Sequence, residues 1–400
     1  MENRLALVIV VDGLRASALG TYGNIIYPTP YLDALAARSL VVEWLLASSP
    51  DLSDYYEAVW HDLPNNLYES NVRSWLLTDD HLIAKRAEEG CFTEVFLYES
   101  PAKASASEVD QSHFARFFDQ ASEQLAQWQA EASKLNTHGL LWVHLQGLSG
   151  PWDAPLEMRS HFLDEEDPTP HPIVEPPAAI EIGEDPDELL SYQVGYGAQV
   201  QLLDSCIAGF VDTFEKTGSS AELFTMVTGS SGFALGEHRM VGHEVSQLYS
   251  EQLHLPCLVS VGNRKAPLPR VRGFVHPCDL RATLLDWLGV VDTTEDSSES
   301  LLRYLAGEEV RIRQLALAYD TAGQWMIRSP AWMLKTSSDE GTAQLFVKPD
   351  DRWEANDVAS RCGEIVEQLN QLLTTCQVQG KEGLDFRKIE LAEDLISPRR

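Results

Sequence analysis

The stretch VTGSSGFALGEH, Val227–His238, follows an apolar run at Leu223–Val227 that predicts a buried strand. Two glycines then allow the chain to turn away from that strand. A loop at the carboxyl end of a buried strand is where α/β proteins usually hold their functional groups. The residues at its tip, Ser230 and Ser231, carry no charge. The loop is therefore an anion cradle, a metal site that has lost its ligands, or an ordinary turn.

The rest of the chain predicts an α/β fold with a smaller appendage. Apolar runs that read as strands alternate with helical patterns up to about residue 305, which favours a large mixed, mostly parallel sheet flanked by helices over residues 1–305. Short strand-like runs and one helical pattern follow, which predicts an antiparallel α+β subdomain over 306–400. The strands are expected at Leu5–Val11, Phe92–Tyr98, Gly139–Leu145, Leu223–Val227, Leu255–Val261, Leu315–Tyr319, Gln324–Arg328, Ala331–Thr336 and Ala343–Val347.

Several polar residues are expected to begin helices. Thr29 before Pro30, Ser53, and Asp279 each read as the N-cap of a helix, and Ser107 with Asp110 forms a capping-box pattern. Further helices are expected from 189 to 215 and near 364–375. The segment from Gly147 to Pro186 has no periodicity, and its acidic, proline-rich part at 164–188 reads as a functional or disordered loop.

Composition limits the classes of partner. The 400 residues include 61 Asp and Glu against 30 Lys and Arg, which gives a formal net charge of −31. Such a charge repels nucleic acid and anionic membrane surfaces, so neither is expected as a partner. The six cysteines show no metal-binding spacing and read as buried thiols. The N-terminal apolar run is too short for a signal peptide and no run is long enough to span a membrane, so we expect a cytoplasmic protein.

Six segments, in order along the chain, resemble sulfatases of the alkaline phosphatase superfamily. The first four are VIVVDGLRASALGTYGN with TPYLDALAARS, HLQGLSGPWDAP, YGAQVQLLDSCIAGFVDTFEKTG, and VTGSSGFALGEHRMVGHEVSQLYSEQLHLPCLV. The last two are HPCDLRATLLDWLGV and AQLFVKPDDRWEANDVA. The resemblance implies the sulfatase fold across nearly the whole chain. It also implies a site built from a divalent cation, usually Ca²⁺, a formylglycine nucleophile made from Cys or Ser, and basic groups around the sulfate.

The nucleophile segment departs from the family pattern. Alignment of the Ser-Pro at 49–50 places Leu52 where the family has Cys, and Leu52 cannot act as a nucleophile. Ser53 is its neighbour, but it lacks the surrounding motif and reads better as a helix N-cap. The paired aspartates that end the first strand in sulfatases are reduced to Asp12 followed by Gly13. Asp12 is therefore the only retained candidate for a metal ligand, and a turn residue is the other reading.

The other site segments also lack residues that the resemblance implies. Ser149 falls where the resemblance implies a histidine, and Ser230 and Ser231 fall where it implies a metal-binding Asp with its His or Asn partner. His238 ends a retained LGEH run, which is compatible with a purely structural role. His243 stands at the position of a family lysine and is the one basic substitute.

These substitutions lead to a main hypothesis and two alternatives. The main hypothesis is a catalytically inactive member that keeps the fold and a vestigial cleft, with no cofactor and with a small anion or a protein as partner. The first alternative is an active hydrolase of sulfate or phosphate esters that uses Ser53, Asp12 and His243 with Ca²⁺ or Mg²⁺. The second is an interaction protein that acts through the acidic segment 164–188. The opening loop, in the main hypothesis, is a metal site whose ligands have been replaced.

Overall fold

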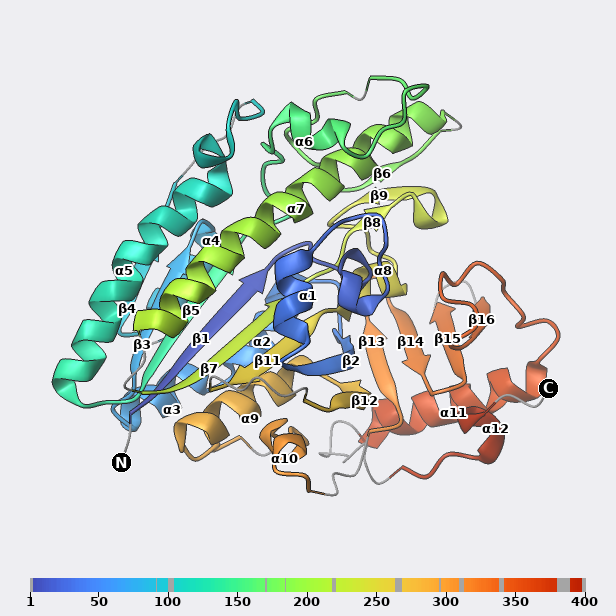
Figure 1. Ribbon diagram of the computed structural model, residues 1–400. Helices are drawn as coiled ribbons and strands as arrows, with labels where there is room; N and C mark the ends of the chain where they lie inside the picture. The colour runs from blue at the N-terminus through green and yellow to red at the C-terminus, as the bar shows by residue number, and fades with distance from the viewer. Residues whose placement is uncertain are drawn as a thin grey trace.

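A large mixed sheet forms the centre of the molecule (Figure 1). The computed structural model describes residues 3–90, 92–99, 104–169, 171–183, 185–217, 221–262, 268–294, 296–308, 313–337, 342–379 and 389–397. Within these residues nine strands pair in the order β10-β2-β11-β7-β1-β5-β3-β4, with β12 also paired to β2. They are β1 (Arg4–Val11), β2 (Leu40–Leu46), β3 (Arg73–Thr78), β4 (Glu94–Leu97), β5 (Gly139–Leu145), β7 (Glu222–Gly229), β10 (His254–Leu255), β11 (Cys257–Val261) and β12 (Arg270–Val275).

The strands near β1 are parallel, and this explains their uninterrupted apolar sequences. β1 pairs in parallel with β5 and β7, and β3 pairs in parallel with β4 and β5. β11 runs antiparallel to both β7 and β2. The predicted mixed, mostly parallel sheet is therefore confirmed.

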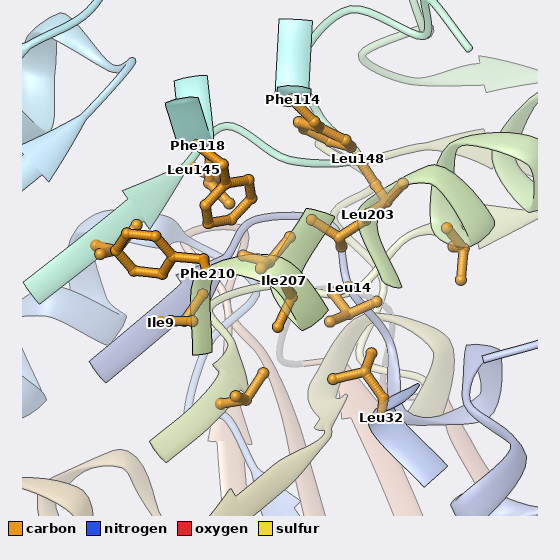
Figure 2. Packing of buried hydrophobic residues seen from close by; sticks show 14 of the residues in the cluster. Ile9, Leu14, Leu32, Phe114, Phe118, Leu145, Leu148, Leu203, Ile207 and Phe210 are labelled. Atoms are coloured by element: carbon orange, nitrogen blue, oxygen red, sulfur yellow. The ribbon is translucent and has the colours of Figure 1, made fainter. Parts of the chain in front are cut away.

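Helices cover both faces of this sheet. Ile9 and alternate residues of β1 pack with α1 (Pro30–Ala36), α5 (His113–Leu135) and α7 (Pro186–Thr217), where Phe118 and Phe210 form part of the core (Figure 2). The intervening residues of β1, such as Val8, pack against the opposite layer. That layer consists of α2 (Leu52–Trp60), α3 (Leu63–Glu69), α4 (His81–Glu89) and α9 (Pro277–Leu288).

A second, smaller sheet follows the large one in sequence, at the right of Figure 1. It is antiparallel and consists of β13 (Ala316–Tyr319), β14 (Gln324–Arg328), β15 (Trp332–Ser337) and β16 (Ala343–Val347). Because side chains alternate along a strand, each strand presents two faces. Ile327 packs with Leu369 of α11 (Gly363–Gln379), whereas Met326 joins the core beside the large sheet. The predicted antiparallel sheet and the helix α11 are confirmed, and the separation of this part at residue 305 stays a prediction.

The first turn of α1 is completed by a residue far away in sequence. Thr29 is the N-cap residue, but its hydroxyl donates to Asp33 at 3.3 Å instead of capping the helix. The carboxylate of Asp204 in α7 accepts from the backbone N–H groups of Tyr31 at 3.1 Å and Leu32 at 2.8 Å. The expected role of Thr29 is therefore taken by a side chain from another helix.

Three other helix starts differ from expectation by a few residues. The N-cap of α2 is Asp51, whose carboxylate accepts from the backbone N–H of Ser53 at 2.7 Å, so Ser53 lies in the first turn. Ser112 caps α5 after a short 3₁₀ turn at Val109–Gln111. His276 is the N-cap of α9, and Asp279 accepts from its backbone N–H at 2.9 Å from the third helical position. A polar residue caps each of these helices, as predicted, but in each case it is a residue a few positions away from the predicted one.

The proline-rich acidic segment is fixed to the body of the protein. β6 (Ile180–Glu181) pairs with β9 (Met240–Gly242), which pairs with β8 (Ala234–Leu235).

The remaining short helices are α6 (Leu156–Ser160), α8 (Ser250–Leu253), α10 (Leu302–Leu305) and α12 (Glu393–Ile396). Among the described residues, no helix combines the length and the apolar character that a membrane span needs.

Candidate functional site

The carboxyl ends of β1 and β7 bring Asp12 and the serine pair together. The Asp12 Oδ1 atom accepts a hydrogen bond from the Ser230 hydroxyl at 3.2 Å and a short one from the Ser231 hydroxyl. The backbone N–H of Gly13 donates to the Ser231 hydroxyl oxygen at 3.2 Å. All three side chains are buried. The acidic residue of the expected metal site is therefore hydrogen-bonded to the two serines that the resemblance places beside it.

Gly13 allows a second loop to pack against this pair. Its φ angle is +73°, and a Cβ there would lie 2.9 Å from both the backbone nitrogen and the hydroxyl oxygen of Ser149. Other residues rarely adopt that backbone angle, and none would fit the space. The loop after β5 thus approaches the end of β1, which places Ser149 beside Asp12.

Five of the eight predicted site residues line one cavity. Its volume is about 470 Å³, and it lies between the ends of the central strands and the first turn of the small sheet. The predicted residues among its lining are Asp12, Leu52, Ser149, Ser231 and His243. Segments separated by more than 200 residues in sequence therefore meet here, as the resemblance implied for a sulfatase site.

The other three predicted residues lie outside this lining. Ser230 is buried directly behind Asp12. Ser53 is exposed, and its hydroxyl oxygen accepts from the Arg86 guanidinium at 3.3 Å. His238 has a φ of 51° and stacks on Tyr249, with 3.5 Å between the ring centroids.

Four acidic residues that the sequence did not single out also line the cavity. They are Asp51, Asp80, Glu244 and Asp320. With Asp12 they make five carboxyl groups against one histidine, and the described lining contains neither lysine nor arginine. An anion entering this cavity meets charges of its own sign. Asp320 directly follows β13, which was predicted as a strand at Leu315–Tyr319, whereas Asp80 follows β3, which was not predicted.

A neutral pair lies in the core beneath the acidic lining. The hydroxyl of Tyr56 and the Nδ1 atom of His144 are 2.6 Å apart, and both side chains are buried. Burial lowers the pKa of His144, whereas Asp12 and Asp79 act in the opposite direction. The net decrease keeps the imidazole neutral at neutral pH, so His144 contributes no positive charge to the cavity.

The retained LGEH run has a structural explanation. Glu237 forms a largely buried ion pair with Arg15, with 2.7 Å between Oε1 and Nη1. Its other oxygen accepts from the backbone N–H of Leu235 at 2.7 Å. Burial acts to raise the pKa of Glu237, but Arg15 and these hydrogen bonds bring it below its usual value. The motif thus ties the loop after β7 to the loop after β1 without facing the cavity.

The cavity residues do not fit a divalent cation site. Within the described chain, the group of three His, Cys, Asp or Glu side chains with ligand atoms within 4.8 Å of one another is His238, Glu251 and Glu354, away from the cavity. There Glu354 already accepts from the Ser250 hydroxyl at 2.6 Å and from the Lys348 ammonium. Burial, with nearby Glu237 and Glu354, raises the pKa of Glu251 to about 8. A protonated acid and a paired carboxylate are poor ligands for Ca²⁺.

Comparison with protein families identifies the chain. The sequence model of the sulfatase family matches residues 61–290, which is more than half of the chain. The chain belongs to the sulfatase family. A comparison with curated proteins gives no sequence match.

Solved structures share the fold of this sulfatase-family protein. A structure described as a 2-O GAG sulfatase superposes with a TM-score of 0.70 at 14% identity, covering 98% of this chain and 95% of that one. A phosphonate monoester hydrolase of Agrobacterium radiobacter has a TM-score of 0.70 at 14% identity and covers 100% of both chains. The phosphonate monoester hydrolase of Silicibacter pomeroyi gives 0.71 at 14% identity, with 96% of each chain covered. At this identity the likeness concerns the fold alone.

Proposed function

We propose that this sulfatase-family protein is a pseudoenzyme, which keeps the sulfatase fold and a cleft but does not hydrolyse sulfate or phosphate esters. The observation that carries the proposal is the hydrogen bonding of Asp12 to Ser230 and Ser231. A metal ligand needs free oxygen lone pairs and further hard ligands around it. Here both serine hydroxyls donate to Oδ1 of Asp12, and neutral hydroxyls stand where the resemblance implies further ligands.

The charge of the cavity supports the same proposal. Ester hydrolysis of this kind needs positive groups that stabilise the charge developing on the sulfate or phosphate oxygens. The lining instead presents five carboxyl groups and His243. Leu52, at the position of the nucleophile, has no reactive atom. The nucleophile, the metal shell and the cationic groups are thus replaced together.

The alternative of relocated chemistry has less support. It requires Ser53, Asp12 and His243 to act on one substrate, and Asp12 and His243 do line the same cavity. Ser53 does not, because its hydroxyl is exposed at the start of α2 beside Arg86. A cytoplasmic location, and the exclusion of nucleic acid as a partner, stay predictions from the sequence.

Metal analysis combined with ester assays tests the proposal. The purified protein is analysed for bound divalent metals and then assayed with aryl sulfate, aryl phosphate and aryl phosphonate monoesters, with and without added Ca²⁺, Mg²⁺, Mn²⁺ or Zn²⁺. We expect substoichiometric metal and no turnover above the buffer rate. A stoichiometric metal ion together with turnover that Asp12→Asn or Ser53→Ala abolishes would show that the protein is an enzyme.

A further inference from the structure

A second cavity lies where the small sheet meets the large one. Its volume is about 310 Å³, at the low end of the roughly 300–1,000 Å³ common for small-molecule sites. It shares no lining residue with the acidic cleft. The two lie at opposite ends of β14, since Asp320 precedes that strand and Arg328 is its last residue.

The charge of this second cavity is opposite to that of the chain. Its lining contains Arg270, Arg328, Lys348 and Arg352, whereas Glu43 and Glu251 are its acidic residues. The pKa of Glu251, raised to about 8 mainly by burial, leaves that carboxyl group mostly protonated at neutral pH. In a protein with 61 acidic and 30 basic residues, such a surplus of cations around one cavity needs an explanation.

Arg328 is the most informative of these cations. Its side chain lies on the face of β14 that looks toward the large sheet, and the residue is only 3% exposed. Its guanidinium carbon is 3.9 Å from the ring centroid of Trp44 and 5.7 Å from that of Phe274. Its guanidinium group forms neither a hydrogen bond nor an ion pair with any described residue, and its Nε atom is buried without a partner. Burial lowers the pKa of Arg328 to about 10, so it stays charged at neutral pH.

The aromatic rings stabilise this charge but leave its N–H donors unused. A guanidinium carries five N–H donors, and a cation–π contact engages the flat face of the group. The nearby carboxylate of Glu354 is already bound by Lys348 and Ser250. A buried cation with unused donors is costly unless a partner supplies the missing acceptors.

Two further arginines at the mouth of the cavity are also free of carboxylates. Arg270 donates to the carbonyl and hydroxyl oxygens of Thr21, each at 3.2 Å, and Arg352 donates to the carbonyl oxygen of Tyr22 at 3.1 Å. Neither forms an ion pair among the described residues, and both side chains are exposed. Each therefore keeps further donors that an anion in the cavity could use.

We propose that this junction cavity is an anion-binding site, in which Arg328, with Arg270 and Arg352, binds the phosphate, sulfate or carboxylate group of a small molecule. Planar guanidinium groups match the spacing of two oxygens on such a group and bind it through paired, charge-assisted hydrogen bonds. The site differs from the acidic cleft in residues, position and charge, and it requires no catalysis.

Thermal unfolding with added anions tests the site. Inorganic phosphate, sulfate and acetate are titrated against the full chain in a low-salt buffer, and phenyl phosphate, phenyl sulfate and benzoate are titrated in parallel. The first set tests for binding of a free inorganic anion, and the second for an anionic group on an organic molecule. We expect the melting temperature to rise and reach a plateau with at least one oxyanion, because ligands that bind only the folded state stabilise it by mass action.

Three variants identify the residues involved. In Arg352→Gln, the half-saturating concentration should increase about tenfold, since one charge-assisted contact is lost. Arg328→Met should abolish the saturable rise, and its melting temperature in anion-poor buffer should equal or exceed that of the unsubstituted protein, because the unpaired charge is gone. The matched control is Arg303→Gln, which removes an exposed arginine paired with Glu308 at 2.7 Å and should leave the titration unchanged.

Two results would overturn the proposal. One is a melting temperature that rises linearly and equally in all four proteins, since excluded salts stabilise folded proteins without a site. The other is the absence of any saturable response in the unsubstituted protein. Since Arg352 is exposed, Arg352→Gln gives a decisive answer even if Arg328→Met does not fold.

Discussion

The Ser231 hydroxyl donates a hydrogen bond to the carboxylate of Asp12, at the point where the resemblance to sulfatases implies a metal ion. The pair is buried at the carboxyl ends of β1 and β7, and Gly13 also donates to the serine. These hydrogen bonds tie the loop after β7 to the loop after β1.

Loss of the Ser231 hydroxyl should destabilise the fold. Ser231→Ala leaves the buried Asp12 carboxylate with one hydroxyl donor in place of two, and a hydrogen bond to a charged group contributes about 1.5–3 kcal/mol. The free energy of unfolding in urea measures the change. Ser53→Ala removes an exposed serine and should alter stability by less than about 0.5 kcal/mol. Equal effects of the two substitutions would argue against a structural role for Ser231.

Asp12→Asn separates a structural Asp12 from a metal ligand. The amide oxygen of asparagine can accept from both serine hydroxyls, and the substitution removes a buried charge. We expect an unchanged or higher melting temperature, with the same value in EDTA and in Ca²⁺. If Asp12 held a cation, the unsubstituted protein would melt at a lower temperature in EDTA, and Asp12→Asn would remove that difference.

The Arg15–Glu237 ion pair should make the LGEH run essential for stability. Glu237→Gln leaves the buried guanidinium of Arg15 without its counter-charge, for which about 3–5 kcal/mol of destabilisation is typical. Chemical denaturation gives the difference. The matched control is Glu181→Gln, whose exposed partner Arg239 is 3.9 Å away and whose loss should cost less than about 0.5 kcal/mol. If Glu237→Gln lowered the free energy of unfolding only slightly, the structural explanation of the LGEH run would be wrong.

Glu251 should make the protein less stable as the pH rises. Its pKa is raised from 4.5 to about 8, so the folded state keeps a proton that the unfolded state releases between these values. The contribution of Glu251 to the free energy of unfolding is therefore full below about pH 4.5, and it is lost as the pH rises to about 8. Glu251→Gln cannot ionise, so its stability relative to the unsubstituted protein should increase from pH 5 to pH 8. Unfolding curves across that range provide the measurement, and Glu181→Gln should give a flat difference.

The central sheet was predictable where each strand carries its own signal. β1 and β7 are continuous apolar runs because helices cover both faces, and such runs are visible without a structure. β2, β3 and β12 were missed; charged residues such as Glu43 and Arg272 interrupt β2 and β12. Local hydrophobicity thus identified the long central strands β1, β5 and β7 better than the strands farther from the centre of the sheet.

The candidate site was predictable only in part, for a related reason. Asp12 directly follows β1, and Ser231 is the second residue after β7, so the parallel pairing of these strands brings them to one edge. Asp320 and Arg328 reach their cavities through the packing of one sheet on another, and no pattern in the chain encodes that contact locally. The opposite charges of the two cavities could therefore not be predicted from the sequence.

The capping of α1 by Asp204 bears on how the chain folds during synthesis. The acceptor lies 173 residues after the N–H group of Tyr31, so a ribosome releases the first helix long before its cap exists. α1 has only seven residues, and isolated helices of that length are unstable in water. The segment must wait for α7 to dock. A chaperone that binds the nascent chain would therefore find the apolar face of residues 30–36 accessible while the 173 residues from Tyr31 to Asp204 are added.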